Sequence, residues 1–182
     1  SFMVAFDKKS GAEKWRVKRD IKSTWSTPFV WKNKVRTELV ASGSKVISYD
    51  PDSGKELWKL EGMNGRCAAT PVGDAEMLYL GTGGGMGGAG PLAAVKAGAK
   101  GDITPAYGET SSEGIAWIAE RSGPPMSSPL LYNGLLYVPD QRGGMLACHD
   151  AKTGKQHFKV RIPGAKGFTS SPWAYDGKVF LL

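Results

Sequence analysis

The sequence has little of what disulfide frameworks, metal centres and membrane helices require. Its 182 residues include only two cysteines and two histidines. Cys67 and Cys148 are far apart, so they supply neither a disulfide framework nor a CxxC metal motif, and we expect two small buried side chains. No apolar run approaches the roughly 18–20 residues of a membrane helix. Charge follows residues 1–6 at once, so no signal peptide is predicted and we expect a soluble chain.

Basic residues outnumber acidic ones, 24 to 17, and the formal net charge is +7. An excess of basic residues can indicate binding to nucleic acid or to an anionic membrane surface. Here the basic residues are scattered, and the densest group alternates along an expected strand at residues 14–19. We therefore interpret the charge as a solvated surface, and we predict no nucleic-acid partner and no transmembrane segment.

Glycine, proline and aromatic residues are abundant, and they recur at a fixed spacing. The chain has 25 Gly, 11 Pro and six each of Trp, Tyr and Phe, which favours short strands and turns over helices. Residues 5–13, 48–56 and 148–156 align without gaps, each with an Asp, a Ser or Thr three places on, a Gly, and an aromatic four places after the Gly. The motif members are Asp7, Gly11 and Trp15; Asp50, Gly54 and Trp58; and Asp150, Gly154 and Phe158. A degenerate copy at 95–98 leads to Trp117.

A triplet that ends in Ser/Thr-Pro follows each aromatic residue, at 26–28, 69–71, 127–129 and 170–172. Pro28 and Pro71 are 43 residues apart, as are Pro129 and Pro172. This period is that of a four-stranded propeller blade. The carboxylate of an Asp before a tight turn accepts hydrogen bonds from backbone N–H groups, and Gly readily adopts the positive φ that the turn needs. Each motif therefore predicts a turn between two antiparallel strands. The aromatic residue then buries its face against the neighbouring blade.

We therefore predict an all-β fold, a β-propeller of four-stranded antiparallel blades with about four blades present. Residues 1–182 are interpreted as one partial propeller domain. The expected strands are 3–7 and 13–18; 26–31, 36–42, 45–50 and 55–60; 69–73, 77–82, 92–96 and 115–120; 127–132, 135–140, 145–150 and 155–162; and 170–175 and 178–182.

The repeated motif resembles the tryptophan-docking motif of propellers of the pyrroloquinoline quinone (PQQ)-like family, and the resemblance covers nearly the whole chain. That family includes quinoprotein alcohol dehydrogenases and the non-enzymatic scaffold subunit of the outer-membrane β-barrel assembly machinery. The chain also looks like the PQQ-binding-like repeat proteins. The resemblance implies a ring of seven or eight blades and a periplasmic or otherwise extracytoplasmic location.

The first and last segments are complementary halves of a blade. Three arrangements are open: a closed four-bladed ring, two chains paired into an eight-bladed ring, or a fragment of a longer propeller, which we favour. Open edges would expose interblade aromatic residues and invite self-association.

The resemblance also implies what a quinoprotein site needs: PQQ, a calcium or lanthanide ion, a carboxylate base, Glu, Asn or Asp ligands, an Arg, a Trp floor and often adjacent cysteines. This chain has no adjacent cysteines, and its carboxylates lie mostly in turns, where capping is a sufficient role. We predict no catalytic residue, no metal ligand and no cofactor. His149 and His157 share one motif without a second ligand cluster nearby, so a metal or catalytic role is not expected. The alternative is a PQQ-dependent quinoprotein oxidoreductase, with PQQ and calcium held partly by blades outside this chain.

Two segments interrupt the repeat. Residues 83–91 form a Gly-rich loop that matches Gly-x-Gly-x-x-Gly at Gly83, Gly85 and Gly88, but a strand follows it, so we interpret it as an interstrand loop and not as a dinucleotide site. Residues 97–114 form an inserted loop in place of the Asp-Gly turn. This loop is either a contact surface or a tolerated insertion.

The mouth of the central channel is the remaining candidate site. Inner strands begin at the proline triplets, so the residues at and before the triplets are expected to ring one mouth, where they bind a peptide strand or ligand or merely pack the channel. The predicted binding residues are Trp25, Ser26, Arg66, Met126, Ser127, Phe168 and Ser170. Together these inferences predict a non-catalytic scaffold for protein or ligand binding in an extracytoplasmic compartment.

Overall fold

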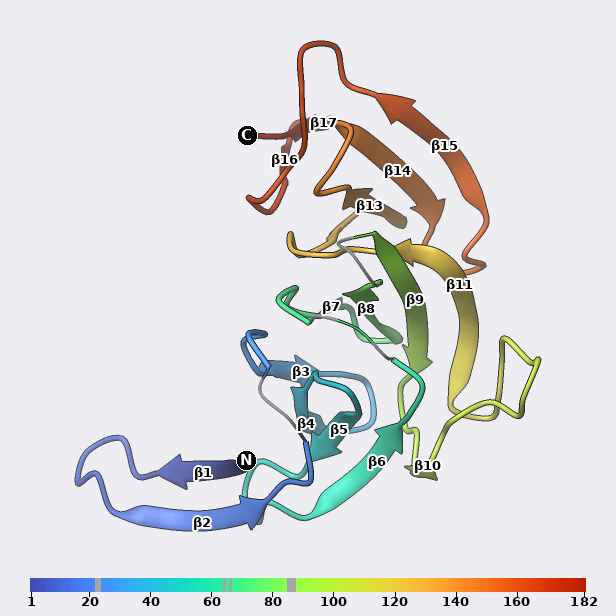
Figure 1. Cartoon of the computed structure of the whole chain (residues 1–182). Helices are drawn as coiled ribbons and strands as arrows, with labels where there is room; N and C mark the ends of the chain where they lie inside the picture. Colours follow the sequence, from blue (N-terminus) through green and yellow to red (C-terminus); the bar gives the residue numbers. More distant parts are fainter. Residues whose placement is uncertain (22–23, 64, 66, 85–87) are drawn as a thin grey trace.

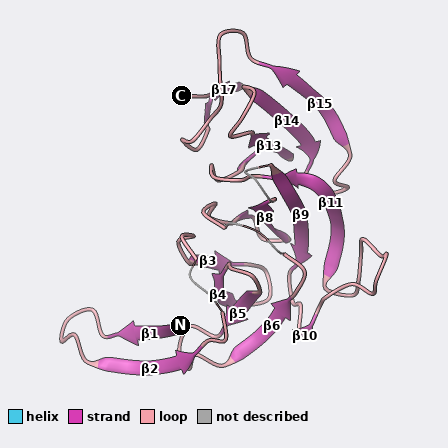
Figure 2. Ribbon diagram, in the orientation of Figure 1, coloured by secondary structure: helices cyan, strands magenta, loops and turns pink. Residues whose placement is uncertain are grey.

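The computed structural model describes residues 1–21, 24–63, 65, 67–84 and 88–182. Over these ranges the chain consists of strands, turns and loops (Figure 2). None of the described residues forms a helix of the length and apolar character needed to cross a membrane.

The strands form three full blades and two half-blades. The first half-blade holds β1 (Phe2–Phe6) and β2 (Glu13–Lys18). The first full blade holds β3 (Phe29–Lys32), β4 (Thr37–Ala41), β5 (Val46–Tyr49) and β6 (Glu56–Leu60), with β10 (Gly101–Asp102) added at its outer edge. The second full blade holds β7 (Val72–Gly73), β8 (Met77–Gly83), β9 (Ala89–Lys96) and β11 (Ile115–Gly123). The third holds β12 (Leu130–Tyr132), β13 (Leu135–Pro139), β14 (Met145–Asp150) and β15 (Gln156–Arg161), and the last half-blade holds β16 (Trp173–Tyr175) and β17 (Lys178–Phe180).

Within each full blade the four strands follow one another as antiparallel neighbours, which confirms the predicted all-β fold of four-stranded blades. The sheets stand side by side along an open arc from the β1–β2 hairpin to the β16–β17 hairpin (Figure 1). The short strands β3, β7 and β16 lie on the concave side, and the long strands β6, β11 and β15 lie on the convex side (Figure 1). The two half-blades are separate sheets at opposite ends of the arc, so they do not close a four-bladed ring.

The hydrophobic core lies between blades. One cluster joins the first and second blades through side chains that include Trp31, Trp58 and Leu80. Another joins the second and third blades and includes Trp117 and Leu136. Because both faces of an inner sheet meet a neighbour, strands in the middle of the arc are buried on both faces, as in β5, where all four residues are buried.

The predicted turns have the expected local chemistry. Asp50 accepts hydrogen bonds from the backbone N and Oγ of Ser53, at 2.8 and 2.7 Å. Gly54 has a φ of 72° and donates its N–H to the Asp50 carbonyl. The turns that begin at Asp7 and Asp150 repeat this arrangement. Each carboxylate is therefore used locally, and the hydrogen bonds it accepts lower the pKa of all three carboxyls.

The inserted loop at 97–114 adds to the neighbouring blade. Its strand β10 pairs parallel with β6, with Gly101 opposite Trp58 and Asp102 opposite Lys59. Ile103 is buried against the core between the first two blades. Hydrogen bonds from Thr104, and then Lys59 nearby, lower the pKa of Asp102 to about 2. The insertion thus covers an outer edge strand that would otherwise present unpaired backbone groups.

The Gly-rich segment is a hairpin between two antiparallel strands. Gly83 ends β8 and pairs with Ala89, and β9 already includes Gly90 and Pro91. Gly85 lies outside the described residues. Since an antiparallel strand follows where a dinucleotide fingerprint needs a helix, the segment lacks the geometry of a phosphate-binding turn.

Candidate functional site

Each inner strand is preceded by an extended segment whose side chains alternate between the blades and solvent. The residues three places before the triplet prolines form what we call the rim positions. They are Trp25, Ala68, Met126 and Thr169. Trp25 is 68% exposed and Met126 is 42% exposed, Thr169 is exposed and Ala68 is half-buried. Cys67, Pro125 and Phe168, each one place earlier, are buried, as expected where successive side chains point to opposite sides.

The triplet hydroxyl groups connect one blade to the next. Ser26 Oγ donates to the carbonyl of Ala69 at 2.8 Å, across 43 residues of sequence. Ser127 Oγ donates to the carbonyl of Phe168 at 3.1 Å. The middle residues of the later triplets are linked in the same way, since the Thr70 N–H donates to Ser128 Oγ at 2.9 Å and the Ser128 N–H donates to Ser171 Oγ at 3.0 Å. The repeat period seen in the sequence is therefore the spacing of interblade hydrogen bonds.

The predicted binding residues separate into three groups. Trp25 and Met126 are exposed at the rim, and Met126 Sδ accepts a hydrogen bond from Gln141 Nε2 at 3.1 Å. Ser26, Ser127 and Ser170 donate their hydroxyl groups to backbone carbonyls, and Ser170 Oγ reaches that of Leu182 at 2.7 Å.

Phe168 is only 5% exposed, so its side chain packs inside and not at the mouth, which corrects its placement. Arg66 lies outside the described residues. Thr169 and Ala68 take the rim places instead, and the sequence contains the signal that identifies them. Trp25 and Met126 both stand three places before a proline, and the same count from Pro71 and Pro172 gives Ala68 and Thr169.

The docking aromatics also separate into groups. Trp15 donates its indole N–H to the carbonyl of Pro51 at 2.9 Å, and Trp117 donates to that of Ala151 at 3.0 Å. Phe158 remains 39% exposed on β15, because the next sheet holds only β16 and β17 and lacks the Asp-x-x-Ser/Thr-Gly turn that joins the two outer strands of a blade.

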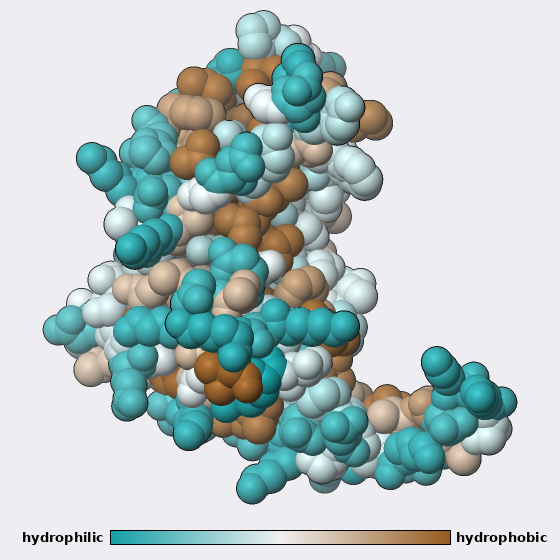
Figure 3. All heavy atoms as spheres, turned by 180° about the vertical axis from the view of Figure 1, so that it is seen from behind, coloured by the Kyte–Doolittle hydropathy of each residue, from teal (hydrophilic) through white to brown (hydrophobic). Residues whose placement is uncertain are grey.

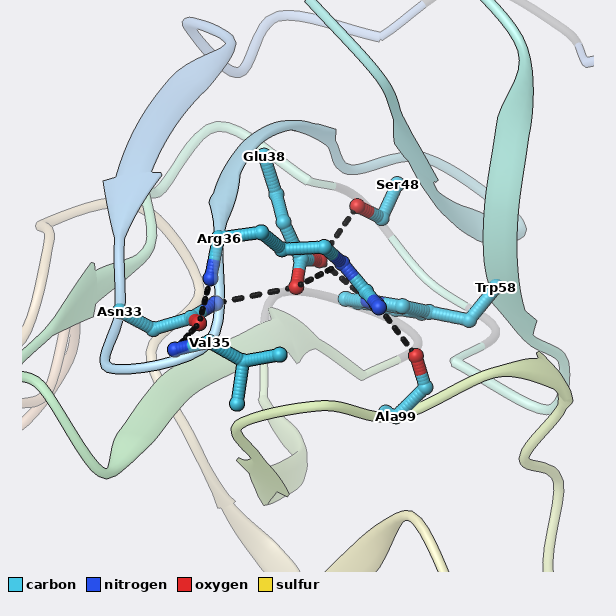
Figure 4. Close-up of polar contacts among 7 residues, drawn as sticks. All are labelled: Asn33, Val35, Arg36, Glu38, Ser48, Trp58 and Ala99. Carbon is cyan, nitrogen blue, oxygen red and sulfur yellow. Dashed lines mark hydrogen bonds and ion pairs between the residues drawn. The ribbon is translucent and has the colours of Figure 1, made fainter.

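Trp58 departs from the docking pattern, because the inserted loop replaces the turn it would meet. Its indole N–H instead donates to Glu38 Oε2 at 2.6 Å inside its own blade (Figure 4). Ser48 Oγ donates to the same oxygen at 2.6 Å, and Asn33 Nδ2 donates to Oε1 at 3.0 Å. Arg36 places Nε 3.0 Å from Oε1 and donates Nη2 to the carbonyl of Ala99 in the inserted loop. The carboxylate is fully buried with both oxygens partnered, so this cluster is structural.

The groups that normally do chemistry are buried or isolated. Burial raises the pKa of the Cys67 and Cys148 thiols, which disfavours the nucleophilic thiolate. His149 is 1% exposed, its Nδ1 lies 3.2 Å from the Gly154 carbonyl, and burial lowers its pKa, which favours the neutral ring. Over the described part of the chain, no three His, Cys, Asp or Glu side chains gather where they would hold a metal ion.

These residues do not fit a quinone cofactor with its metal. Both oxygens of the buried Glu38 carboxylate already contact four partners in the blade interior, so they are not available to a metal ion. The two cysteines lie in separate segments of the chain and do not form an adjacent pair.

A cleft of about 380 Å³ lies between the inserted loop and the second blade. Its wall includes the apolar side chains of Met63, Pro91 and Ile118, together with Glu109 and Glu120. None of the rim positions is among its lining residues.

Comparison with known proteins supports the same architecture. A family model described as outer membrane protein assembly factor BamB matches residues 2–128. No curated protein matches the sequence. Among solved structures, BamB from Moraxella catarrhalis is 18% identical with a TM-score of 0.62, over 98% of this chain and 48% of that chain. The quinohemoprotein alcohol dehydrogenase from Comamonas testosteroni is 15% identical with a TM-score of 0.67, over 98% of this chain and 36% of that one.

A europium-containing methanol dehydrogenase is 12% identical with a TM-score of 0.61, over 94% of this chain and 41% of that chain. At these identities the likeness shows the fold alone. The chain spans less than half the length of each of these relatives.

Proposed function

Because the chain belongs to the family of the outer membrane protein assembly factor BamB, we propose that it is a non-catalytic propeller scaffold whose rim positions bind a protein partner in an extracytoplasmic compartment. The observation that carries the proposal is the exposure of Trp25 and Met126 on a base of interblade hydrogen bonds. Large apolar side chains that are held in place by a rigid scaffold are the usual anchors of protein interfaces.

The partner is a protein segment with apolar side chains, because the rim positions expose the indole of Trp25 and the thioether of Met126, and none of the four rim positions carries a charged side chain. The triplet serines take no part in recognition, because their hydroxyl groups already donate to carbonyls within the chain. The family name, that of an assembly factor for outer membrane proteins, supports both a protein partner and an extracytoplasmic location.

The test is competitive photo-crosslinking. A chain with a photoreactive amino acid in place of Trp25 is incubated with a bacterial periplasmic extract, and excess unlabelled competitor is added. Wild-type competitor should remove the adduct, and Trp25→Ala or Met126→Ala competitor should be at least about tenfold weaker, as for an interface anchor. A Tyr107→Ala competitor is the matched control, since Tyr107 is fully exposed in the inserted loop. Equal competition by all variants would exclude the rim as the binding surface.

The alternative is a quinoprotein oxidoreductase, which is supported by the structural likeness to the two dehydrogenases. The residues described in this chain do not supply its site, so the missing groups would have to come from blades outside it. Dye-linked alcohol oxidation by the full-length protein with added PQQ and calcium tests this alternative, and no oxidation together with no change in quinone absorbance removes it.

A further inference from the structure

The cleft between the inserted loop and the second blade is built from separate parts of the chain. The segment after β6 supplies Met63, β9 supplies Pro91 and β11 supplies Ile118, and residues 104–105 and 109–110 of the inserted loop also line it. β6 and β11 lie on the convex side of the arc (Figure 1), and on the face seen from behind many hydrophilic side chains project along that edge (Figure 3). The apolar side chains inside the cleft therefore contrast with the edge around it.

The cleft lies in the middle of the arc. All of its lining residues belong to the first two blades, to the segment between them or to the inserted loop. The first blade is flanked by the β1–β2 hairpin and the second by the third blade, so the outer neighbours of both are already present (Figure 1). Blades joined to either end of the arc would stand beside those neighbours and not beside the cleft.

Hydrogen bonds hold the loop side of the cleft in place. β10 pairs with β6, and directly after it Ile103 donates its N–H to the carbonyl of Lys59 at 3.0 Å. Thr104 Oγ1 accepts the N–H of Glu61 at 3.0 Å, and the N–H of Glu109 closes a turn within the loop at 2.9 Å. The loop wall is thus ordered without a ligand, so binding does not have to order it.

The apolar wall offers a surface for a hydrocarbon group. Met63 is 1% exposed in the core between the first two blades, and Ile118 packs against that core while it remains half-buried, as does Pro91 at the start of β9. A volume of about 380 Å³ is that of sites that bind small organic molecules. A bare metal ion would leave this wall unused, and the described residues hold no group of three metal-ligating side chains. The wall therefore favours a ligand with a hydrocarbon body.

The polar part of the lining is mostly acidic, in a chain whose net charge is positive. Three carboxylate residues line the cleft, Glu61, Glu109 and Glu120, against one basic residue, Arg121. Ion pairs of 3.0 and 3.3 Å with two lysines of the first blade already balance the charge of Glu61. The charge that remains favours a cation.

Glu109 and Glu120 are the carboxylates that remain for a ligand. Neither makes an ion pair with another residue of the described chain. Glu120 comes two residues after Ile118 on β11, so the two side chains leave the strand on the same side. Glu109 belongs to the loop wall of the same cleft. A cationic group therefore finds two carboxylates close to a surface for its hydrocarbon body.

We propose that this cleft is a second binding site, which takes a small organic cation made of a hydrocarbon body and an ammonium group. The body contacts the apolar wall, and the ammonium group pairs with Glu109 and Glu120. A carboxylate ligand is disfavoured, because it would meet the same two acidic groups with only Arg121 to attract it. The site is independent of the rim positions proposed above.

Three probes with the same number of carbon atoms test the proposal: hexylamine, hexanol and hexanoate, each titrated at neutral pH into the full-length protein. Binding is followed by NMR spectroscopy through the labelled methyl groups of Met63 and Ile118. Hexylamine should shift both signals in a saturable way. Hexanol should bind at least about threefold more weakly, because it lacks ion pairs at a partly exposed site, and hexanoate should cause no shift.

Substitutions assign the binding to the two carboxylates. Glu109→Gln and Glu120→Gln should each weaken hexylamine binding about threefold and leave hexanol binding unchanged. Glu113→Gln is the matched control, because Glu113 is an exposed carboxylate of the same loop that does not line the cleft. Trp25→Ala should also leave hexylamine binding unchanged, since a failure of the rim proposal would not affect this site.

Three outcomes would each overturn the proposal. Saturable binding of hexanoate that Arg121→Gln removes would identify an anion site. Equal affinity for hexylamine and hexanol, or equal weakening by Glu113→Gln and Glu120→Gln, would mean that the cleft carboxylates do not recognise the ammonium group. Methyl signals of Met63 and Ile118 that respond to none of the probes would show that the cleft binds no ligand of this class.

Discussion

Gly54 lies directly beneath the indole ring of Trp15, so closely that a Cβ atom would stand 2.7 Å from Trp15 Cε3. The same indole donates its N–H to the carbonyl of Pro51, at the start of the turn that Gly54 ends. Trp117 repeats both contacts on Gly154 and Ala151. The turn and the docked ring are therefore one unit, in which glycine provides the backbone conformation and the space for the ring.

We predict that Gly54→Ala destabilises the chain more than Gly134→Ala. Both glycines have positive φ, 72° and 75°, so in both variants the alanine is forced into a left-handed backbone conformation, which lowers the free energy of unfolding by about 1–2 kcal/mol. Gly134 has nothing within 4 Å of a Cβ, whereas Gly54→Ala also displaces Trp15, which adds about 1–3 kcal/mol. Urea unfolding measures the difference in stability between the two variants. Equal losses would show that the contact between Gly54 and the Trp15 ring does not contribute to stability.

Glu38→Ala is expected to cost about 3–5 kcal/mol of folding stability, because it leaves the Trp58 indole N–H without its acceptor and the Arg36 guanidinium without its buried counter-charge. Glu38→Gln keeps an acceptor oxygen and should cost less. Glu56→Ala, at an exposed position of the same blade, is the control and should stay within about 0.5 kcal/mol of wild type. Denaturant midpoints that are the same for Glu38→Ala and Glu56→Ala would contradict a structural role.

The inserted loop should contribute to stability through Ile103. This side chain is 3% exposed in the core between the first two blades, so Ile103→Ala should lose about 2–5 kcal/mol. Tyr107→Ala, in the same loop but fully exposed, should have no effect. Thermal unfolding followed by circular dichroism distinguishes them, and matching transitions would mean that the loop is attached without contributing to the core.

Acid should destabilise the chain below about pH 3.8, the ordinary aspartate value. Hydrogen bonds from the residue three places on lower the pKa of Asp7, Asp50 and Asp150 in the folded chain. A carboxyl whose pKa is lower in the folded chain than in the unfolded chain stabilises the fold at any pH above its unfolded-state pKa. That contribution is lost as the pH falls through the folded-state pKa. Asp50→Asn should therefore differ from wild type by a constant amount above pH 3.8 and by a shrinking amount below it. Parallel urea midpoints across the whole range would contradict the assignment.

The sequence by itself determined the blade and its turns. Asp7, Gly11 and their repeats act within a few residues of one another, so their spacing is enough to predict the turn. The prolines 43 residues apart fix the blade length, because each blade repeats the same short-range pattern. Trp25 and Met126 were recognisable as rim residues for the same reason, since both keep a fixed distance from a triplet proline.

Only the tertiary structure decided where the aromatic residues dock and what the insertion does. Trp15 and Trp58 have the same local motif, yet one rests on a glycine corner of the next blade and the other donates to Glu38. The difference comes from residues 97–114, which follow Trp58 by some forty positions and remove the corner it would have met. The misplacement of Phe168 is a different case, because the count of three places back from Pro172 gives Thr169, and the burial of Phe168 agrees with that count. Local turn chemistry is encoded within a few residues, but a docking contact depends on a surface that exists only after two blades have come together.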